Sequence, residues 1–523
     1  MTARAVMVLG TSSHVGKSML TTALCRILAK RGHRVAPFKA QNMSLNSAAT
    51  VEGLEIGRAQ ALQAEAAGVA PSVHMNPILL KPAGGMTSQV VVRGRIWGKL
   101  TASDYHRRRV EELMPAVSES YEALAAEYEV VILEGAGSPA EINLKQHDIV
   151  NMRMAELADA SCLLVGDIDR GGVFASLLGT VELLEREEQD RIKGFVINKF
   201  RGDITLLSPG VHMMEDRLRK PCLGVIPYID RLTLEEEDSL GLTDTDAQGH
   251  AAWLNFDPDR PLRIAVIEFP SFSNFTDFDA LRSESSVALR FCRSLAQLQQ
   301  ADILILPGSK QTVDDLSWMR AAGLARAVIE HANAGLVVGI CGGMQMLGHQ
   351  IVDTDGIETA GCTKGLGLLP INTTMRPSKV SRNSAGQLVT QSLFGKPIQS
   401  VSLRGYEIHV GETSYLGKSQ PFAQLTRLSD GRAESEVDGC ITPDTRIFGT
   451  YLHGLFDEDS FRHAFIGAAR EFYHLAPASE LNNWKQRREE SLNRLAVTVS
   501  QSLDMPKIFG WVGLSYRNAQ EIQ

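Results

Sequence analysis

A cysteine framed by glycines, Cys341 in the sequence Gly-Ile-Cys-Gly-Gly, constrains the fold of this chain more than any other feature. The apolar residues 336–338 before it are typical of a buried strand, and residues 344–347 after it are good helix formers. The glycines permit a turn that is too tight for Cβ atoms. The pattern therefore predicts a strand, a sharp turn at Cys341 and a helix, which together are a unit of an α/β fold.

This position also makes Cys341 a candidate nucleophile. The N-terminus of the following helix would offer backbone N–H groups and a positive potential, and both favour a thiolate. In a nucleophile elbow, the N–H of the next residue, here Gly342, helps to form an oxyanion hole. The alternative is a free cysteine that is buried as a small hydrophobic side chain. The surrounding glycines favour the nucleophile.

Length and composition predict a globular protein of two or three domains, because 523 residues with 44% hydrophobic and 22% charged residues can fill more than one core. The formal net charge of −8 gives no reason to expect nucleic acid or an acidic membrane as partner. Small molecules are favoured, and a homo-oligomer is left open. The seven cysteines are scattered and form no CxxC pair, which indicates reduced thiols in a cytoplasmic protein. No apolar run approaches the length of a membrane span.

A glycine-rich loop near the N-terminus predicts a site for ATP. The sequence GTSSHVGKS at residues 10–18 lies between an apolar run and a helical pattern. In that context, loop and helix N–H groups bind phosphate oxygens, the lysine reaches the terminal phosphates, and the serine binds Mg²⁺. Five residues rather than four separate the two glycines, which departs from the Walker A spacing; a chance glycine-rich turn is the alternative. The candidate residues of this loop are Gly10, Thr11, Gly16, Lys17 and Ser18.

Glu134 is a candidate ligand of the same Mg²⁺. The strand 129–133 ends at this residue, and ligands of an open α/β sheet bind at the carboxyl ends of its strands. Together with the Ser18 hydroxyl, the Glu134 carboxylate would supply the hard oxygen ligands that this ion prefers. Alternatively, Glu134 caps the turn at the glycines that follow it.

Two more strand ends carry candidate binding residues. Strands 162–165 and 194–197 alternate with helical patterns, which predicts a parallel sheet that is covered by helices on both faces. Asp169 and Arg170 follow the first strand as candidate substrate-binding residues, and Asn198 follows the second, where it would read a nucleobase edge. All three could instead be solvated loop ends.

An amide-rich loop, residues 37–47, ends an apolar stretch of the N-terminal half. Amide side chains donate and accept hydrogen bonds and seldom catalyse, so Gln41 and Asn42 are candidate substrate-binding residues. Lys39 in the same loop is a candidate nucleotide-binding residue.

A polar, irregular stretch separates two strand-and-helix patterns. We place a first domain at residues 1–245, a linker at 246–261, a second domain at 262–475 and a helical tail at 476–523.

Two residues of the second domain complement Cys341. Strand 447–452 ends at His453, and a histidine in the same domain as a glycine-framed cysteine is the expected general base, although a lone histidine is usually structural. Strand 302–306 ends before Gly308, whose N–H would be the second oxyanion donor unless this proline–glycine turn carries no chemistry.

These motifs resemble known families. The second domain resembles the triad-type, class I-like glutamine amidotransferase domains, in their cobalamin-pathway branch. The N-terminal half resembles the dethiobiotin-synthetase-like P-loop domain, which is a doubly wound parallel sheet. In this joined order the chain resembles the cobyric acid synthase family over nearly its whole length. The resemblance rests on residues 339–347, 307–309, 451–454, 37–47, 134–141, 167–172 and 405–409.

The resemblance implies an activity: amidation of the b, d, e and g carboxylates of adenosylcobyrinic acid a,c-diamide, with ATP, Mg²⁺ and L-glutamine, to give adenosylcobyric acid. The related a,c-diamide synthase is the alternative enzyme. A nucleotide switch or partitioning ATPase shares the first domain but would leave Cys341 and His453 unexplained. A third hypothesis is a stand-alone hydrolase that the nucleotide half only regulates.

The residue types support the reaction class. A carboxylate is a poor acyl donor, so a phosphate-binding site suggests activation as an acyl phosphate, which an amine then displaces. Cys341 explains the amine, because its thiolate would attack the side-chain amide of glutamine. Gly308 and Gly342 would stabilise the oxyanion, and His453 would protonate the departing ammonia. Ammonia must avoid protonation by bulk water, so we expect the two sites to face each other through a dry interface.

One position departs from the amidotransferase pattern. Many triad-type amidotransferases have glutamate two residues after the histidine, but here that position is Leu455. Leucine cannot orient an imidazole, so we expect a cysteine–histidine dyad. The carboxylates that could substitute are Asp457 and Glu407, and a backbone carbonyl could also hold the ring.

Overall fold

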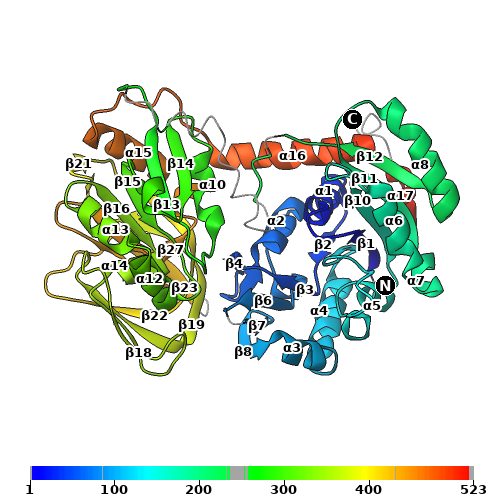
Figure 1. Ribbon diagram of the computed structural model, residues 1–523, viewed down its shortest axis with the longest axis horizontal. Helices are drawn as coiled ribbons and strands as arrows, with labels where there is room; N and C mark the ends of the chain where they lie inside the picture. Colours follow the sequence, from blue (N-terminus) through cyan, green and yellow to red (C-terminus); the bar gives the residue numbers. More distant parts are fainter. Residues whose placement is uncertain are drawn as a thin grey trace.

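The computed structural model describes residues 3–84, 86–230, 232–235, 253, 257–429 and 432–516. It contains two α/β lobes, which a long helix near the C-terminus connects (Figure 1). Most of the expected linker 246–261 lies outside the described residues, as does the expected boundary at 245.

The first lobe is built on a parallel sheet of six strands. Alternate residues of its central strand enter two different cores: Val6 and Val8 pack on one face, and Met7 and Leu9 on the other. This two-sided burial explains why the strands are almost wholly apolar, and it confirms the doubly wound sheet. In spatial order the strands are β12 (Cys222–Pro227), β11 (Ile192–Phe200), β10 (Ser161–Asp167), β1 (Arg4–Gly10), β9 (Val130–Glu134) and β2 (Val35–Phe38).

Helices cover both faces of this sheet (Figure 1). They are α1 (Lys17–Lys30), α2 (Arg58–Ala67), α4 (Met114–Glu127), α5 (Met152–Leu157), α6 (Val173–Glu182), α7 (Arg186–Arg191) and α8 (Ile204–Leu218), with the short η1 (Val73–Met75) and η3 (Lys145–His147).

A smaller sheet and a hairpin extend the first lobe between β2 and α4. The hairpin reaches the second lobe, where it contacts β19 (Ile371–Leu388) and β22 (Ser402–Tyr415). The sheet consists of β3 (Gln41–Met43), β6 (Ile78–Pro82), β7 (Thr87–Val92) and β8 (Arg95–Thr101); the hairpin is β4 (Ser47–Ala49) and β5 (Glu55–Gly57), and α3 (Ala102–Arg108) and η2 (Arg109–Leu113) follow β8.

The second lobe has two sheets around one core. The main sheet is parallel except for its last strand, in the order β14 (Val287–Cys292), β13 (Leu262–Ile267), β15 (Ile303–Leu306), β16 (Leu336–Ile340), β26 (Ile447–Thr450) and β25 (Cys440–Ile441). The second sheet joins β19 and β22 to β18 (Gly361–Lys364), β17 (Gln350–Asp353), β27 (Leu452–His453), β23 (Ala423–Ser429) and β24 (Arg432–Asp438).

The helices of the second lobe are mostly short. They are η5 (Phe275–Phe278), α10 (Asp279–Arg282), α11 (Leu295–Leu298), α12 (Thr312–Ala321), α13 (Leu324–Ala332), α14 (Gly342–Leu347), η6 (Leu455–Asp457) and α15 (Asp459–Phe472), and a small hairpin is formed by β20 (Ser392–Leu393) and β21 (Lys396–Pro397).

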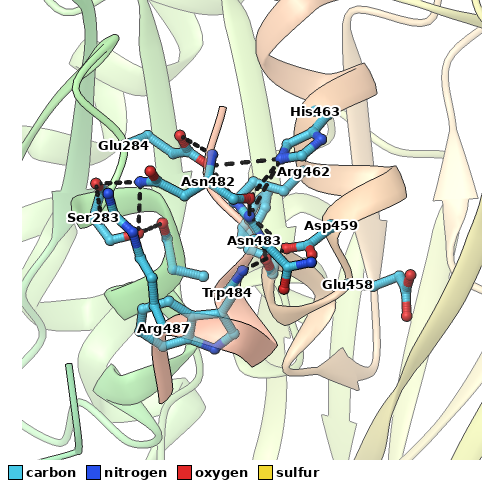
Figure 2. Close-up of polar contacts among 12 residues, drawn as sticks. Ser283, Glu284, Glu458, Asp459, Arg462, His463, Asn482, Asn483, Trp484 and Arg487 are labelled. Carbon is cyan, nitrogen blue, oxygen red and sulfur yellow. Dashed lines mark hydrogen bonds and ion pairs between the residues drawn. The ribbon is translucent and has the colours of Figure 1, made fainter. Parts of the chain in front are cut away.

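Helix α16 (Trp484–Ser502) begins on the second lobe and ends on the first (Figure 1). At its start, Figure 2 shows Arg462 bound to Glu284, Asp459 and the carbonyl of Asn482. Further along, its buried side chains join one core of the first lobe together with α1 and α17 (Met505–Trp511). The tail is therefore an integral part of both lobes. Among the helices that the structure describes, none is long and apolar enough to span a bilayer.

Candidate active site

Cys341 lies between the end of β16 and the start of α14, at the sharp turn that the sequence predicted. Its backbone has φ +52° and ψ −110°, a conformation that costs free energy for a residue with a side chain. The glycines make this turn possible: a Cβ at Gly339 would lie 2.7 Å from the Met344 nitrogen, and one at Gly343 would overlap the Leu306 carbonyl. The Cys341 side chain is almost fully buried.

His453, at the end of β27, lies beside Cys341, and the two groups interact electrostatically. The Cys341 Sγ donates to the Ile408 carbonyl at 3.6 Å. The ring nitrogen Nδ1 of His453 lies 2.7 Å from Oδ2 of Asp277, and the Gly454 N–H donates to Oδ1 of the same carboxylate at 2.9 Å. The three side chains have the order that defines a catalytic triad: nucleophile, imidazole and orienting carboxylate.

The expectation of a dyad is wrong, because Asp277 orients His453 from η5, in a loop that follows β13. Leu455 is fully buried in the core. Neither proposed substitute does this: Glu407 accepts a hydrogen bond from Ser384 and pairs with Arg382, and Asp457 lies 3.8 Å from Arg58. The position of Asp277 after the carboxyl end of a strand was the only signal in the sequence that pointed to it.

The charge of His453 follows from these neighbours. Burial alone would lower the pKa of His453, but the carboxylate of Asp277 and the sulfur of Cys341 outweigh burial and raise this pKa to about 10. The imidazolium form is therefore stable at neutral pH. An imidazolium beside the sulfur holds the proton that a leaving amine needs.

Both predicted oxyanion glycines border this pair. A Cβ at Gly308 would lie 3.0 Å from Cε1 of His453, and a Cβ at Gly342 would lie 3.0 Å from the Ser309 nitrogen. Gly342 is also the first residue of α14, whose first N–H groups have no partner within the helix. Their function as oxyanion donors stays a prediction.

The phosphate loop of the first lobe connects β1 to α1. Gly16 has φ +99°, and a Cβ there would overlap the amide of Asn198, so glycine is required. Lys17 donates to the carbonyls of Ser12 at 2.8 Å and Gly137 at 3.0 Å, across the mouth of the loop. Asn198 donates to the Val15 carbonyl at 2.8 Å and so supports the loop; its contact with a nucleobase stays a prediction.

Glu134 is fully buried at the end of β9 and receives three donors. Its Oε1 accepts from the Ser18 hydroxyl and from Lys39, both at 2.9 Å, and its Oε2 accepts from Gln63 at 2.5 Å. Asn151 rather than Glu134 binds the following turn, because its side chain pairs with both the N–H and the carbonyl of Ala136. Gln63, on α2, was not recognised in the sequence.

These residues fit a magnesium ion. The Ser18 hydroxyl and the Glu134 carboxylate converge at one point, and Mg²⁺ is usually held by one or two such ligands, phosphate and water. No group of three His, Cys, Asp or Glu side chains in the described part of the chain could hold a metal by itself.

The structure places the candidate substrate residues in different surroundings. Gln41 accepts from the Tyr105 hydroxyl and lines a cavity of about 380 Å³ beside Gly137 and Ser138. Asn42 is instead buried, where its amide donates to Gln60 at 3.0 Å, because it faces α2. Asp169 pairs with Arg201 at an exposed loop, and neither Asp169 nor Arg170 is among the residues that line this cavity. Substrate binding by these last two residues stays a prediction.

The two lobes share a buried interface that contains charged, polar and apolar contacts. Glu55 of β5 pairs with Lys81 of the first lobe and with Lys379 of the second. Burial would raise the pKa of Glu55, but the two lysines outweigh it and hold this pKa well below its usual range. An apolar cluster of Ala49, Tyr406 and Ile408 is buried at the same interface. That the two sites face each other through a dry interface stays a prediction.

Comparison with known proteins adds to the geometry. Residues 6–241 match the model of a CobQ/CobB/MinD/ParA nucleotide binding domain, and residues 263–461 match that of a CobB/CobQ-like glutamine amidotransferase domain. A cobyric acid synthase of Moorella thermoacetica is 46% identical over 98% of this chain and 98% of its own length. One of Clostridium botulinum is 45% identical over 97% and 99%, and one of Yersinia enterocolitica is 47% identical over 96% and 97%.

Proposed function

This chain belongs to the cobyric acid synthase family, and on that premise we propose that it converts adenosylcobyrinic acid a,c-diamide to adenosylcobyric acid. It is a glutamine-hydrolysing ligase of cobalamin biosynthesis with a nucleotide-binding and an amidotransferase domain. In the proposed reaction, the b, d, e and g carboxylates are amidated in turn, each with one glutamine and one ATP.

The observation that carries the proposal is a cysteine–histidine–aspartate triad and a phosphate loop in one chain, on two lobes that share a buried interface. Neither half alone requires the other. Glutamine hydrolysis alone does not require a phosphate loop, and a nucleotide switch does not require a cysteine nucleophile.

Glutamine supplies the nitrogen at Cys341. The Cys341 sulfur attacks the side-chain carbonyl carbon of glutamine, and the N–H groups of Gly308 and Gly342 stabilise the tetrahedral oxyanion. His453 donates its proton to the departing amine, the C–N bond breaks, and ammonia leaves. The glutamyl group stays on the Cys341 sulfur as a thioester. A water molecule, deprotonated by His453, then hydrolyses the thioester to glutamate and frees the sulfur. Asp277 keeps the ring in place through both steps.

The first lobe activates the carboxylate. The loop N–H groups and Lys17 bind the phosphates of ATP so that a corrinoid carboxylate can attack the terminal phosphorus, which yields an acyl phosphate and ADP. Ser18 and Glu134 would hold Mg²⁺, whose chemistry is to neutralise charge on the transferred phosphoryl group. Ammonia then displaces phosphate from the acyl carbon and gives the amide.

The cavity beside Gln41 is the proposed seat of the carboxylate-bearing edge of the corrinoid. It opens next to Gly137, whose carbonyl accepts from Lys17, so a carboxylate there lies close to the phosphate loop. Its lining mixes apolar residues such as Met43 and Leu100 with Ser138 and Asn151. Apolar walls with a few polar groups suit a large amphipathic ring that carries carboxylate and amide side chains.

Mass spectrometry of the corrinoid tests the proposal. Incubated with ATP, Mg²⁺ and glutamine, adenosylcobyrinic acid a,c-diamide is expected to lose one dalton per amidation, in four steps. Hydrolysis of glutamine and ATP without any change in the corrinoid would contradict the proposed substrate. Amidation of cobyrinic acid itself at two carboxylates would instead identify an a,c-diamide synthase.

A further inference from the structure

Two buried hydrogen bonds join the amide-rich loop of the first lobe to the turn that carries Asp277. The Phe275 N–H donates to Oδ1 of Asn46 at 3.0 Å, and the Ser47 N–H donates to Oδ1 of Asn274 at 3.0 Å. The Asn46, Ser47 and Asn274 side chains are all buried. The contact is reciprocal, because each lobe gives one backbone N–H and one side-chain oxygen.

The turn itself is short and stiff. Asn274 has φ +54°, its carbonyl accepts from the N–H of Asp277 at 3.0 Å, and Asp277 then binds His453. The amide nitrogen of Asn274 also lies 3.4 Å from both ring nitrogens of His453. A displacement of the turn would therefore move the orienting carboxylate relative to the imidazole.

Asn46 is held firmly enough to fix this turn. Its own N–H donates to the Ser44 hydroxyl at 3.0 Å, and its carbonyl accepts from the Arg58 N–H at 3.1 Å. Arg58 in turn lies over the ring of Tyr406, with 5.7 Å between the guanidinium carbon and the ring centroid, and Tyr406 stacks on His453 at 5.3 Å. The first lobe thus contacts the turn of Asn274 and the ring of Tyr406, two second-lobe neighbours of the imidazole.

We propose that Asn46 is a positioning residue for glutamine hydrolysis, which sets Asp277 against His453 from the other lobe. The same loop carries Lys39, which binds Glu134, and Gln41, which lines the substrate cavity. The synthetase site is thereby connected to the triad by a few residues of one loop and by the two hydrogen bonds between the lobes. This inference rests on the glutaminase half of the proposed function and not on the identity of the corrinoid.

The test measures glutamine hydrolysis by the full-length Asn46→Ala variant. Without the Asn46 oxygen, the turn loses one of its two anchors, and kcat is expected to fall by at least about tenfold with KM for glutamine little changed. Asn383→Ala is the matched control. It removes other interface hydrogen bonds, from the Asn383 amide to the carbonyls of Ala49 at 3.5 Å and Thr50 at 3.1 Å, which do not involve the turn that carries Asp277, and kcat should stay within about twofold.

Two readouts separate positioning from general damage. If Asp277 is displaced, the pKa of His453 falls from its raised value, so the imidazolium is lost at a lower pH and the alkaline limb of the kcat profile moves down in pH. In an Asp277→Ala background, the Asn46→Ala substitution should cause no further loss, because its effect passes through Asp277.

If Asn46→Ala does not fold, Asn46→Ser takes its place, since serine is polar but too short to reach the Phe275 N–H. An unchanged kcat and pH profile in the folded variant would overturn the proposal, and so would an equal additional loss in the Asp277→Ala background. A chain that hydrolyses glutamine normally but amidates no corrinoid would contradict the proposed substrate and leave this inference intact.

Discussion

Asp277 sets both the charge and the orientation of His453. In Asp277→Asn, the amide no longer stabilises the imidazolium and can hold the ring in the wrong tautomer. Since a cysteine is appreciably nucleophilic without full base assistance, we expect glutaminase kcat to fall by about a hundredfold, less than in a serine triad. Steady-state glutamate release measures this.

The controls for this prediction are the carboxylates that the sequence offered. Asp457→Asn and Glu407→Gln should each cost far less than Asp277→Asn, because neither carboxylate binds the ring. Burial raises the pKa of Asp457 to about 7, so this group is partly neutral at neutral pH in any case. A larger loss in either control than in Asp277→Asn would contradict the triad.

Glu134 has a separate, testable function. Glu134→Gln keeps the size of the side chain but removes the charge that Mg²⁺ requires, so the Mg²⁺ concentration for half-maximal amidation should rise by at least about tenfold. Glutamine hydrolysis measured without ATP should be nearly unchanged, because Glu134 lies in the other lobe. An unchanged Mg²⁺ titration would return Glu134 to a structural function, as the partner of Lys39 and Gln63.

Helix α16 stabilises the first lobe although it begins on the second. Leu492 is fully buried between α16 and the sheet, so Leu492→Ala should lower the free energy of unfolding of this lobe by about 2–5 kcal/mol. Val497 lies on the same helix but is half exposed, and Val497→Ala should change the free energy of unfolding by less than about 0.5 kcal/mol. Urea titrations compare the two variants, and equal effects would show that α16 does not pack on this lobe as described.

The elements that sequence predicted best are those whose function is encoded within a few residues. The Cys341 turn and the phosphate loop each consist of a strand, glycines and a helix, so the local pattern predicts both fold and chemistry. The third member of the triad could not be found in this way, because Asp277 is 176 residues from His453 and only the tertiary fold brings η5 and β27 together. The carboxylates that the sequence suggested, Asp457 and Glu407, interact with other groups.

The partners of the amide-rich loop could not be predicted for the same reason, because they lie elsewhere in the sequence. Composition indicated that amides of residues 37–47 bind something, but it could not say what. Gln41 lines the cavity beside Gly137, whereas Asn42 binds Gln60 and Asn46 binds the other lobe. Partners on α2 and η5 decide between these outcomes, and neither helix is adjacent to the loop in sequence.

At the scale of the whole molecule, the proposed function assigns a different reaction to each of the two lobes. In the proposed reaction, glutamine is hydrolysed at Cys341 in the second lobe, and carboxylates are phosphorylated at the phosphate loop of Lys17 in the first. Ammonia is the only intermediate that must cross the interface between them. The buried ion pair of Glu55 with Lys379 and the contact at Asn46 join the lobes there.

Amidation with two nitrogen sources tests this division most directly. Cys341→Ala should abolish amidation with glutamine but retain it with concentrated ammonium chloride at alkaline pH, because free ammonia replaces the product of the second lobe. Lys17→Ala should abolish amidation with both sources, since phosphoryl transfer depends on the positioned charge. Loss of both activities in a folded Cys341→Ala variant, or normal ammonia-dependent amidation in Lys17→Ala, would contradict the account.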